Sequence, residues 1–504
     1  MNIITSKWQR EIESLAVKNN IELITLMRMA GKAVFDNVIA KFNNKKNYKV
    51  SILCGSGGNG GDGFVAGMHF FKSNVDVDII ICNKEPSKCD SLTVYNEAKK
   101  LGLNIIFYNS QKELVLNKTS KADVIIDACY GIGFHGCFSN ELSVLFNSVN
   151  NNKNAYKLAV DVPSGVNCDT ASVCENAFIA DVTLTMIGLK PANILKRSLY
   201  NVGESIVYKM NIPEVLYEDY SSIKTIEIED IKKIMPQRES VSHKGTFGKL
   251  LIIAGCDRYR GAAILATKGA LNSGVGLISV ASTEKVLNAV SNTHPEPILI
   301  DTVNDIEYFE ENLKNYTTCL IGPGLSLSPH SHYLFDIVLK KSNCPLIIDA
   351  DALNILSENI EILKNTNRNI VLTPHLGEFA RLTNKTINEI IDNKIELAKQ
   401  FAKEYNVVLV LKSENTIIAS PTGEIYICTL GNSGMAKGGS GDLLSGIIAS
   451  FTSLTCNAFY GAILGVYIHS YAGDLAKNDL TEFCVTPTAI SNYIPNVIFI
   501  ANTL

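Results

Sequence analysis

An acid stands at the end of a glycine-rich stretch, directly before an apolar helical pattern. The stretch is GGSGD (438–442), and the acid is Asp442. A helix N-terminus carries unpaired N–H donors and about half a positive charge, which together suit a phosphate group. An acid beside a phosphate would repel it unless the acid removes a proton from a hydroxyl that takes part in phosphoryl transfer. We therefore predict that Asp442 is a catalytic base; the alternative is a simple N-cap.

Lys412 is the cation expected at the same site, because it ends the apolar run VVLVLK (407–412). The alternative is a strand-end lysine whose head reaches solvent along an apolar surface. The sequence lacks GxxxxGK[ST], which excludes a P-loop enzyme.

A second glycine loop, CGSGGNGGDGFVAG (54–67), follows a strand-like run and opens a helical pattern. It matches GxGxxG from Gly55, but an ordinary dinucleotide fold also needs an acid at the end of the next strand. That strand ends at Cys82 and Asn83 instead. The loop has more glycines than a tight turn requires, so we expect its backbone N–H groups to bind an anion.

Two further acids end strand-like runs of the first half. Asp127 precedes ACYGIGFHG, and Asp161 precedes VPSG. Ligands of a parallel sheet bind beyond the carboxyl ends of its strands, so we expect these segments to meet the glycine loop. Asn59, Asp127 and Ser164 would offer oxygen ligands suited to a simple cation. The alternative is that both acids only cap the turns that follow them.

The elements that must position these residues alternate between short apolar strands and longer helices, which predicts an α/β protein with mostly parallel, two-sided sheets. A helix is expected over 8–42, and a polar segment at 213–240 places a domain boundary near 215–225. The expected strands are 49–54, 75–82, 123–129, 157–162, 180–187, 249–255, 276–282, 319–324, 345–351, 369–374, 407–412, 416–420 and 424–430.

Composition limits the partners. The 504 residues are 46% hydrophobic and 19% charged, with a net charge of −4, which argues against a nucleic-acid partner and for small molecules. The 13 cysteines are scattered without a CxxC pair, as in a reduced cytoplasmic protein. The start of the chain lacks an apolar signal core, and no apolar run reaches the about 18 residues of a membrane helix, so no membrane partner is expected.

The first half resembles the NAD(P)HX epimerase domain family in LMRMAG (26–31), GGNGGDG (57–63), DACYGIG (127–133), DVPSG (161–165) and ADVTLT (180–185). The resemblance implies a Rossmann-like three-layer α/β fold over 1–218, and potassium ligation by Asn59, Asp127 and Ser164. It implies substrate contacts at Gly58, Asn59, Gly60, Gly61, Asp62, Gly131, Ile132, Gly133, Phe134, His135, Gly136, Cys137 and Asp161. The family usually has Asn where this chain has Gly58, and Thr where it has Ile132.

Epimerisation at a carbon that bears oxygen needs proton transfer to and from that oxygen, which a carboxylate can mediate. We predict Asp161 as the catalytic residue of this half. Asp127 is the competing candidate, but a potassium ion would keep it ionised and occupied.

The second half resembles the ADP/ATP-dependent NAD(P)HX dehydratase family, of ribokinase-like fold, over 226–504. The matching segments are HKGTFGKLLIIAG (243–255), GAAILATKGALNSGVGLISV (261–280), IGPGL (321–325), IDADALN (348–354), TPHLGE (373–378), LKSENTI (411–417) and GNSGMAKGGSGD (431–442). The resemblance implies nucleotide contacts at Lys412, Ser413, Glu414, Asn415, Thr416 and Gly441. It implies substrate contacts at Ala262, Ala263, Gly324, His375 and Asp442. The family tends to have Gly at Ser413 and Thr at Lys437.

Together the two resemblances imply a fused repair enzyme for hydrated NADH and NADPH, which carry an aberrant hydroxyl at C6 of the nicotinamide ring. One half would interconvert the two epimers, and the other would phosphorylate that hydroxyl and eliminate phosphate. ADP is favoured over ATP as the donor, with Mg²⁺, and a homo-oligomer is expected. The alternatives are a ribokinase-like kinase of a small vitamin alcohol and a non-catalytic nucleotide-binding protein.

Overall fold

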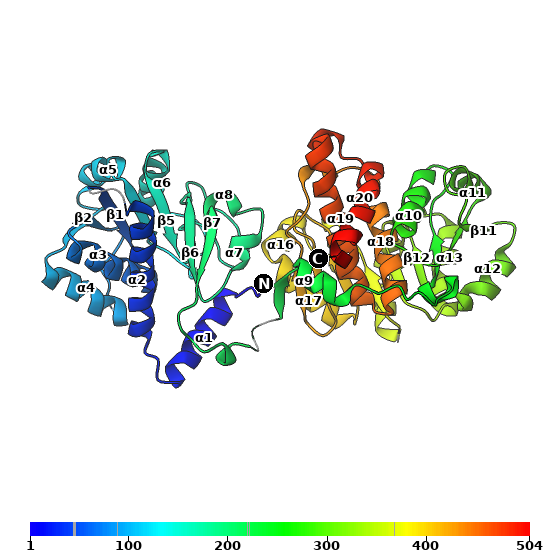
Figure 1. Cartoon of the computed structure of the whole chain (residues 1–504), viewed down its shortest axis with the longest axis horizontal. Helices are drawn as coiled ribbons and strands as arrows, with labels where there is room; N and C mark the ends of the chain where they lie inside the picture. The colour runs from blue at the N-terminus through cyan, green and yellow to red at the C-terminus, as the bar shows by residue number, and fades with distance from the viewer. Residues whose placement is uncertain (44–46, 88, 219, 221, 367, 504) are drawn as a thin grey trace. The chain divides into compact units, whose positions relative to one another are not determined.

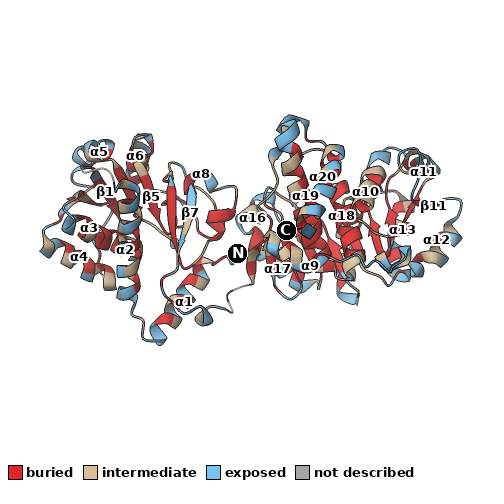
Figure 2. Cartoon of the chain, in the orientation of Figure 1, coloured by how far each residue is buried: buried red, intermediate tan, exposed pale blue. Residues whose placement is uncertain are grey.

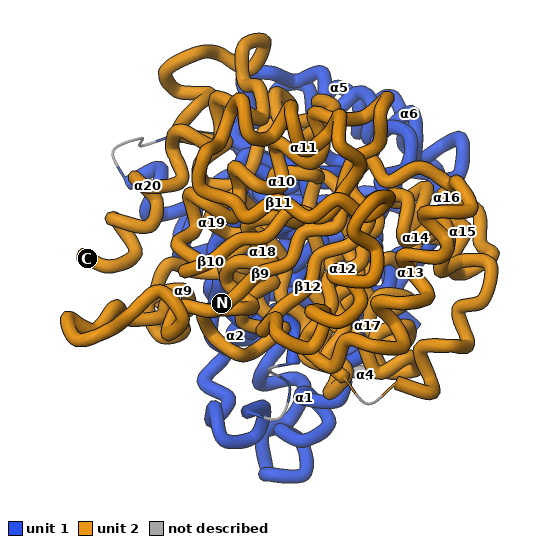
Figure 3. The backbone as a smooth tube through the Cα atoms, turned by 90° about the vertical axis from the view of Figure 1, so that its right-hand side faces the viewer, with its two compact units in different colours: residues 1–223 blue, residues 224–504 orange. Residues whose placement is uncertain are grey.

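The structure is a computed structural model that describes residues 1–43, 47–87, 89–218, 220, 222–366 and 368–503. The chain forms two compact units, residues 1–223 and 224–504, which Figure 3 colours blue and orange. Each unit is built around one twisted sheet with its own apolar core (Figure 1). Both are α/β units with largely parallel sheets, which confirms the fold class predicted from the sequence.

Unit 1 contains a seven-stranded parallel sheet in the order β3-β2-β1-β4-β5-β6-β7. Its strands are β1 (Lys49–Cys54), β2 (Asp76–Ile81), β3 (Asn104–Phe107), β4 (Val124–Ala128), β5 (Tyr156–Val160), β6 (Val182–Met186) and β7 (Glu204–Tyr208). Its helices are α1 (Ser6–Lys18), α2 (Leu23–Phe42), α3 (Gly58–Lys72), α4 (Cys89–Leu101), α5 (Lys112–Ser120), α6 (Asn140–Asn151), α7 (Pro191–Ile194) and α8 (Leu199–Val202).

Successive side chains of a strand point to opposite faces of the sheet, and both faces of this sheet are covered. Ile52 of β1 packs in a cluster with Val34 of α2 and Phe64 of α3. Its neighbour Leu53 belongs to a second cluster, with Leu145 of α6. Unit 1 is therefore a three-layer α/β sandwich, and its buried strands are red in Figure 2.

Unit 2 contains a ten-stranded sheet in the order β11-β10-β9-β12-β13-β14-β15-β16-β17-β8. The strands are β8 (Ile223–Thr225), β9 (Lys249–Ile253), β10 (Leu277–Ser282), β11 (Ile298–Asp301), β12 (Thr318–Ile321), β13 (Leu346–Ile348), β14 (Ile370–Leu372), β15 (Val408–Leu411), β16 (Ile417–Ala419) and β17 (Ile425–Ile427). The strands from β11 to β15 are parallel, and β16 is antiparallel to both of its neighbours, β15 and β17.

The helices of unit 2 are α9 (Ile228–Ile234), α10 (Arg260–Asn272), α11 (Glu284–Ser291), α12 (Ile306–Asn312), α13 (Pro329–Lys341), α14 (Asp351–Ser357), α15 (Leu376–Thr383), α16 (Ile387–Asp392), α17 (Lys394–Glu404), α18 (Ser440–Thr455), α19 (Ala458–Leu480) and α20 (Pro487–Thr503). Helices α10, α18 and α19 pack on one face of the sheet, where Ile252 and Leu320 meet Leu443 and Ile447. None of the helices described is long and apolar enough to cross a lipid bilayer.

The helix expected over 8–42 is instead two helices, α1 and α2. Asn20 lies between them with a φ of 65°, in the left-handed region that ends a right-handed helix. Because of this break, α1 runs in a different direction from α2. Gln9 and Ile12 of α1 are thereby buried against the rest of unit 1.

Candidate active sites

Unit 1 has a cavity of about 520 Å³ at the carboxyl ends of β1, β4 and β5, closed in part by α1 and α2. Predicted site residues in its lining are Gly58, Asn59, Asp62, Gly131, Ile132, Gly133 and Asp161. Parallel strands end at the same edge of a sheet, which is why segments so distant in sequence meet here.

The other predicted residues of the two loops are not part of this lining. Gly60 and Gly61 pack inward: a Cβ on Gly60 would lie 1.9 Å from the Gly55 carbonyl oxygen, and one on Gly61 would lie 2.5 Å from Met27 Sδ. The side chain of Phe134 is buried against the ring of Tyr130, at 5.3 Å between centroids. The other members of the predicted loop are His135, whose Nδ1 lies 3.0 Å from Asn167 Nδ2, Gly136, and the exposed Cys137.

The glycine turn brings the β1 and β4 loops into direct contact. A Cβ on Gly55 would lie 1.9 Å from the carbonyl oxygen of Cys129, so only glycine fits this approach. The Asn59 amide then donates to the Tyr130 carbonyl oxygen at 2.8 Å. The helix α3 starts at Gly58, so its free N–H groups face the cavity mouth.

Asp127 and Ser164 form a buried pair beside these loops. Asp127 Oδ1 accepts from Ser164 Oγ at 2.6 Å and from Cys129 N at 3.1 Å, and Oδ2 accepts from Ser164 N at 2.7 Å. Burial raises the pKa of Asp127 to about 6, against the lowering effect of these hydrogen bonds. Ser164 Oγ also lies 3.4 Å from the Tyr130 carbonyl oxygen that Asn59 contacts. Two of the predicted cation ligands, Asn59 and Ser164, therefore contact one backbone carbonyl, and Asp127 is hydrogen-bonded to Ser164.

Asp161 sits at the end of β5 with a φ of 67°, a conformation that side chains other than glycine seldom adopt. Its Oδ1 lies 2.7 Å from Lys190 Nζ and accepts from Met186 N at 3.0 Å. Gln9 Nε2 donates to Oδ2 at 3.1 Å. Lys190 has no exposed surface, so this is a buried ion pair whose carboxylate borders the cavity.

Several polar residues at this site were not identified from the sequence, among them Gln9, Glu13 and Lys190. Gln9 and Glu13 line the cavity from α1, one helical turn apart. Burial and the charge of Asp161 raise the pKa of Glu13, and burial also raises the pKa of Asp62 well above its ordinary value. Gln9 and Glu13 are four residues apart, which places them on one face of a helix. That spacing could point to the site only after the structure had shown that α1 faces the cavity.

In unit 2, Asp442 lies in the first turn of α18, after Gly439, whose φ is 92°. Burial, followed by the nearby charge of Asp349, raises the pKa of Asp442 to about 6. Lys412 Nζ lies 2.8 Å from Asp349 Oδ1 and 3.2 Å from the Cβ position of Gly441. The structure thus brings the predicted acid and the predicted cation together at a helix N-terminus.

Glu378 is the fourth charged group of this cluster, beside Asp442, Lys412 and Asp349. Burial lowers the pKa of Lys412, but the carboxylates of Asp349, Glu378 and Asp442 outweigh it and raise the pKa overall. Glu378 is buried, and burial raises its own pKa. Asp349 and Glu378 belong to two segments that carried the family resemblance, but neither was singled out as a site residue.

His375 caps α15 beside the cluster. Its Nδ1 accepts from Gly377 N at 2.9 Å and from Glu378 N at 3.3 Å, which leaves the ring proton on Nε2. The Lys412 backbone N–H donates to the Pro374 carbonyl at 2.8 Å and holds the two strand ends together. The His375 side chain is 57% exposed, and its Nε2 lies 3.4 Å from Glu378 Oε1.

The predicted substrate loop after β12 lies directly on the first turn of α10. Gly324 has a φ of 61°, and a Cβ there would lie 2.7 Å from Ala262 Cβ. Ala263 faces the other way and is fully buried. Gly324 and Ala262 are therefore neighbours, and Ala263 supports them from the core.

The predicted nucleotide segment is the turn from β15 to β16. Ser413 Oγ donates to the Asn415 carbonyl at 2.7 Å, and Thr416 Oγ1 donates to the Ser413 carbonyl at 3.4 Å. Glu414 Oε1 lies 2.6 Å from Lys394 Nζ. The Ser413 hydroxyl thus stabilises the turn in which the family tends to have glycine.

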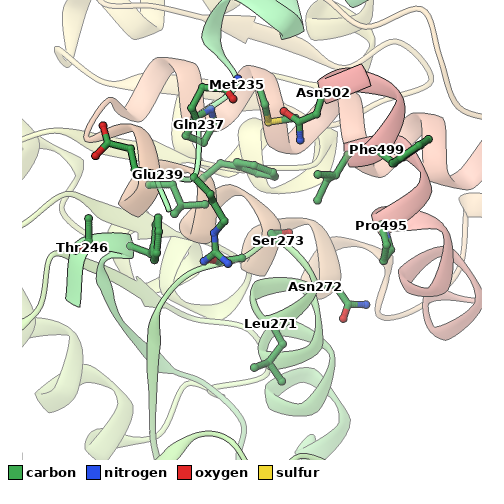
Figure 4. Close-up of a pocket in the computed structure, with 17 residues that line it drawn as sticks. Met235, Gln237, Glu239, Thr246, Leu271, Asn272, Ser273, Pro495, Phe499 and Asn502 are labelled. Atoms are coloured by element: carbon green, nitrogen blue, oxygen red, sulfur yellow. The ribbon is translucent and has the colours of Figure 1, made fainter. Parts of the chain in front are cut away.

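Lys437, the other departure from the family pattern, donates from Nζ to the Phe483 carbonyl at 2.6 Å. Its ammonium group is therefore engaged by the segment after α19. A separate cavity of about 630 Å³, shown in Figure 4, contains none of the predicted site residues in its lining. Phe451 of α18 and Phe499 of α20 line it, so it lies toward the opposite end of α18 from Asp442.

Comparisons with known proteins match both halves of the chain. Residues 250–496 match the family described as NAD(P)H-hydrate dehydratase, and residues 23–192 match the YjeF-related protein N-terminus. The chain is 31% identical to the bifunctional NAD(P)H-hydrate repair enzyme Nnr of Coxiella burnetii, over 93% of this chain and 94% of that protein. It is 30% identical to the enzyme of the same name from Moorella thermoacetica, over 99% and 97%.

A solved structure of a ribokinase-like superfamily protein from Enterococcus faecalis is also similar. It superposes with a TM-score of 0.51 at 30% identity and covers 56% of this chain and 96% of its own. The C-terminal part of the chain therefore has the ribokinase-like fold expected from its motifs.

Proposed function

The chain belongs to the family of bifunctional NAD(P)H-hydrate repair enzymes, and from that premise we propose how its residues divide the two reactions. The family repairs hydrated NADH and NADPH by epimerisation and by nucleotide-dependent dehydration. We assign epimerisation to residues 1–218 and dehydration to residues 226–504. The observation that carries the dehydratase assignment is the cluster of Asp442, Lys412 and Asp349 at the N-terminus of α18.

In the dehydratase site, Asp442 is proposed to take the proton from the C6 hydroxyl of the hydrated ring. The hydroxyl oxygen then attacks the terminal phosphorus of the nucleotide, and the bond from that phosphorus to the nucleotide breaks. Loss of the phosphate from C6, with a proton from C5, restores NAD(P)H. A base with a pKa near 6 suits this role, because it is ionised at neutral pH and still binds a proton in the transition state.

The phosphate groups are proposed to bind at the N-terminus of α18, with Gly441 and Lys412 facing them. A glycine at 441 keeps the space next to Lys412 Nζ open, since a Cβ there would lie 3.2 Å away. The turn over 412–416 is proposed to contact the rest of the nucleotide. The substrate ring is proposed to lie against Ala262, Gly324 and His375, with Ala263 behind them.

The donor set of this site fits Mg²⁺. Asp349 Oδ2 is buried and has no hydrogen-bond partner among the described residues, and Glu378 is a second buried carboxylate. We propose that Asp349 and Glu378 hold the ion. When bound, Mg²⁺ would neutralise charge on the phosphoryl group being transferred. Lys412 alone leaves one oxygen of Asp349 without a partner, which is why the residues present suit a cation.

In the epimerase site, Asp161 is proposed to exchange a proton with the substrate oxygen. The buried ammonium group of Lys190 holds its Oδ1, while its Oδ2 stays on the cavity side with Gln9. The proposed substrate-binding residues are those of the two loops, 58–62 and 131–137, together with Asp161.

The oxygen atoms of Asp127, Ser164 and the Tyr130 carbonyl also fit potassium, which prefers several oxygen ligands. A half-turn of the Asn59 amide would place its oxygen where its nitrogen now meets the Tyr130 carbonyl. We propose that these residues bind K⁺, and that the ion orients the loop that holds the substrate.

We also propose ADP rather than ATP as the phosphoryl donor, a homo-oligomeric assembly and a cytoplasmic location. The support for ADP is the fused arrangement, which resembles the bacterial-type enzymes. The support for a cytoplasmic location is the number of scattered cysteines without paired spacing.

One assay tests both proposed reactions and the choice of nucleotide. Prepared NADHX is incubated with the protein and ADP, and separately with ATP, while the absorbance of recovered NADH is followed. Recovery of both epimers with ADP is the expected result. No recovery with either nucleotide would contradict the dehydratase assignment, and recovery of only one epimer would contradict the epimerase assignment.

A further inference from the structure

Helix α1 places a pair of side chains in the epimerase cavity. Gln9 is 5% exposed, and its Nε2 donates both to Glu13 Oε1 and to Asp161 Oδ2, each at 3.1 Å. Both α1 residues line the cavity that also contains Asp161. The family match in this half begins at residue 23, so it covers neither of them.

The orientation of the Gln9 amide is fixed by its neighbours, because carboxylate oxygens accept hydrogen bonds and only the amide nitrogen can donate to both. Its oxygen is therefore turned away from Glu13 and Asp161. Gln9 Oε1 is buried and has no hydrogen-bond partner among the described residues. A buried acceptor at a cavity wall is complemented by a donor on the molecule that fills the cavity.

The two carboxyl groups joined by Gln9 have different surroundings. Asp161 is paired with the buried ammonium group of Lys190. Glu13 has no ion pair at that range in the described part of the chain, and burial followed by the charge of Asp161 raises its pKa, while Gln9, Lys190 and Arg10 lower it. Glu13 is thus the one of the two whose surroundings favour holding a proton, whereas the Asp161 carboxylate is held in place by Lys190.

We propose that Glu13 is the second proton-transfer residue of the epimerase, acting with Asp161, and that Gln9 Oε1 accepts a hydrogen bond from a donor of the hydrated nicotinamide ring. The proposal rests on the epimerase function assigned above to unit 1. It names the two residues that the exchange of a hydroxyl between two faces of a ring requires, one to protonate the departing oxygen and one to deprotonate the arriving one.

The step balances without an oxidant or reductant. Glu13 gives its proton to the C6 hydroxyl, the C6–O bond breaks with its electron pair on oxygen, and water leaves. The lone pair of the ring nitrogen forms the N1=C6 bond. Water then adds to the other face of C6, the N1=C6 pair returns to nitrogen, and Asp161 takes the proton from the added water. Asp161 then releases its proton to solvent and Glu13 takes one from solvent, which returns both groups to their first protonation states for the next turnover.

Asp62 and Asp90 are further acids that line this cavity, and the raised pKa of Asp62 would also let it hold a proton. Among the residues that the structure describes, no side chain bridges Asp62 to Asp161 by hydrogen bonds as Gln9 bridges Glu13 to Asp161. The experiment therefore compares Glu13→Gln with Asp62→Asn, both in the full chain.

Each variant is given one purified epimer of NADHX without nucleotide, and the appearance of the other epimer is followed by chromatography. We expect Glu13→Gln to lower kcat for exchange by about 10²–10⁴-fold, with KM changed by less than about threefold. Dehydration of the preferred epimer with ADP, measured on the same protein, should be unchanged. Glu11→Gln is the matched control: Glu11 is on the same helix, is 42% exposed and pairs only loosely with Lys7, at 3.9 Å.

Glu13→Asp keeps the carboxyl group, so it tests whether Glu13→Gln loses exchange only because the structure is disturbed. It should recover part of the exchange that Glu13→Gln loses, at a similar thermal midpoint. Exchange by Glu13→Gln at the wild-type rate would overturn the inference, as would loss confined to Asp62→Asn or a change in KM alone. If the wild-type protein itself fails to exchange the epimers, the epimerase function fails together with the inference, so the two failures are distinguishable.

Discussion

Asp349 holds Lys412 through one carboxylate oxygen, at 2.8 Å from Nζ, and leaves its other oxygen buried with no hydrogen-bond partner in the part of the chain described. A single ammonium group therefore satisfies only half of this carboxylate. The arrangement fits a bound cation on the second oxygen, next to the helix N-terminus where a phosphate would lie.

The first prediction concerns this second oxygen. Asp349→Asn should raise the Mg²⁺ concentration needed for half-maximal dehydration by at least about tenfold, because a neutral amide is a weaker ligand. Initial rates measured over a range of Mg²⁺ concentrations test it. Asp336→Asn is the control, since Asp336 is exposed on α13 and pairs with Lys340 at 3.8 Å. An unchanged Mg²⁺ dependence would place the ion elsewhere.

The second prediction concerns Asp442 as the base. Asp442→Asn should lower kcat for dehydration by about 10²–10⁴-fold and leave nucleotide affinity within about threefold of wild type. Rates from NADH absorbance and calorimetric titration with ADP separate the two effects. Near-normal turnover would reduce Asp442 to an acid in the first turn of α18 without a part in the chemistry; the N-cap of that helix is Gly439 and not Asp442, as the sequence alternative had it.

The third prediction is the pH dependence that a pKa of about 6 gives Asp442. The base must be ionised, so the dehydration rate should rise through pH 6 and level off above pH 7. The contribution of Asp442 to folding stability changes with pH in the opposite direction: it falls as pH rises. The folded pKa lies above the ordinary value near 3.9, so the folded state binds this proton more tightly, and its stabilising effect is lost as pH rises from about 4 to 6.

Asp442→Asn should therefore be more stable than wild type at pH 7.5, by about 1–3 kcal/mol, and equally stable at pH 4. Calorimetric melting of both proteins at the two pH values measures this. A variant that is less stable than wild type at pH 7.5 would show that hydrogen bonds to the carboxylate outweigh its desolvation.

The fourth prediction uses the buried pair of Asp161 and Lys190. Asp161→Asn should abolish epimer exchange and leave dehydration of the preferred epimer intact. It should also destabilise unit 1 by about 3–5 kcal/mol, because Lys190 is left buried without its partner. Adding Lys190→Met should recover most of that stability without recovering exchange. Exchange at the wild-type rate in the single variant would assign the catalytic role to another residue.

The fifth prediction concerns potassium. Replacing K⁺ by choline should slow epimer exchange and raise its KM, while Asn59→Leu should remove the response to K⁺. Asp127→Ala should weaken substrate binding but retain partial exchange at high substrate concentration. An exchange rate that is the same in both salts would argue that Asp127 and Ser164 only shape the loop.

The strands that sequence reasoning identified are all interior strands of the two sheets. The four that it missed are β3, β7, β8 and β11, which are the four edges. An edge strand is covered less completely than an interior one, so it need not be a continuous apolar run. The exposed residues of ILID in β11 and of ESIVY in β7 show this directly. The apolar pattern alone therefore predicts the middle of such a sheet better than its margins.

The candidate site residues also divide into those that the sequence pattern could identify and those that it could not. Residues on loops with a distinctive composition, such as Asn59, Asp161 and Asp442, could be singled out from glycine and acid spacing. Gln9 and Glu13 could not, because they sit in an ordinary amphipathic helix that was expected to continue through Asn20. Lys190 follows a strand and has no charged neighbour in sequence; its partner is brought to it by the fold.

The position of β8 at the margin of the ten-stranded sheet bears on how the protein can be divided. Ile223–Thr225 cover the β17 edge, and the Ile226 N–H continues that pairing to the Ile427 carbonyl at 3.2 Å. A fragment that begins at residue 226 would lack this cover and expose a three-residue apolar strand, IYI, with unpaired backbone groups. Open edges of this kind recruit strands from other molecules. A fragment that begins a few residues before Ile223 keeps the edge closed and should remain dispersed where the shorter one aggregates.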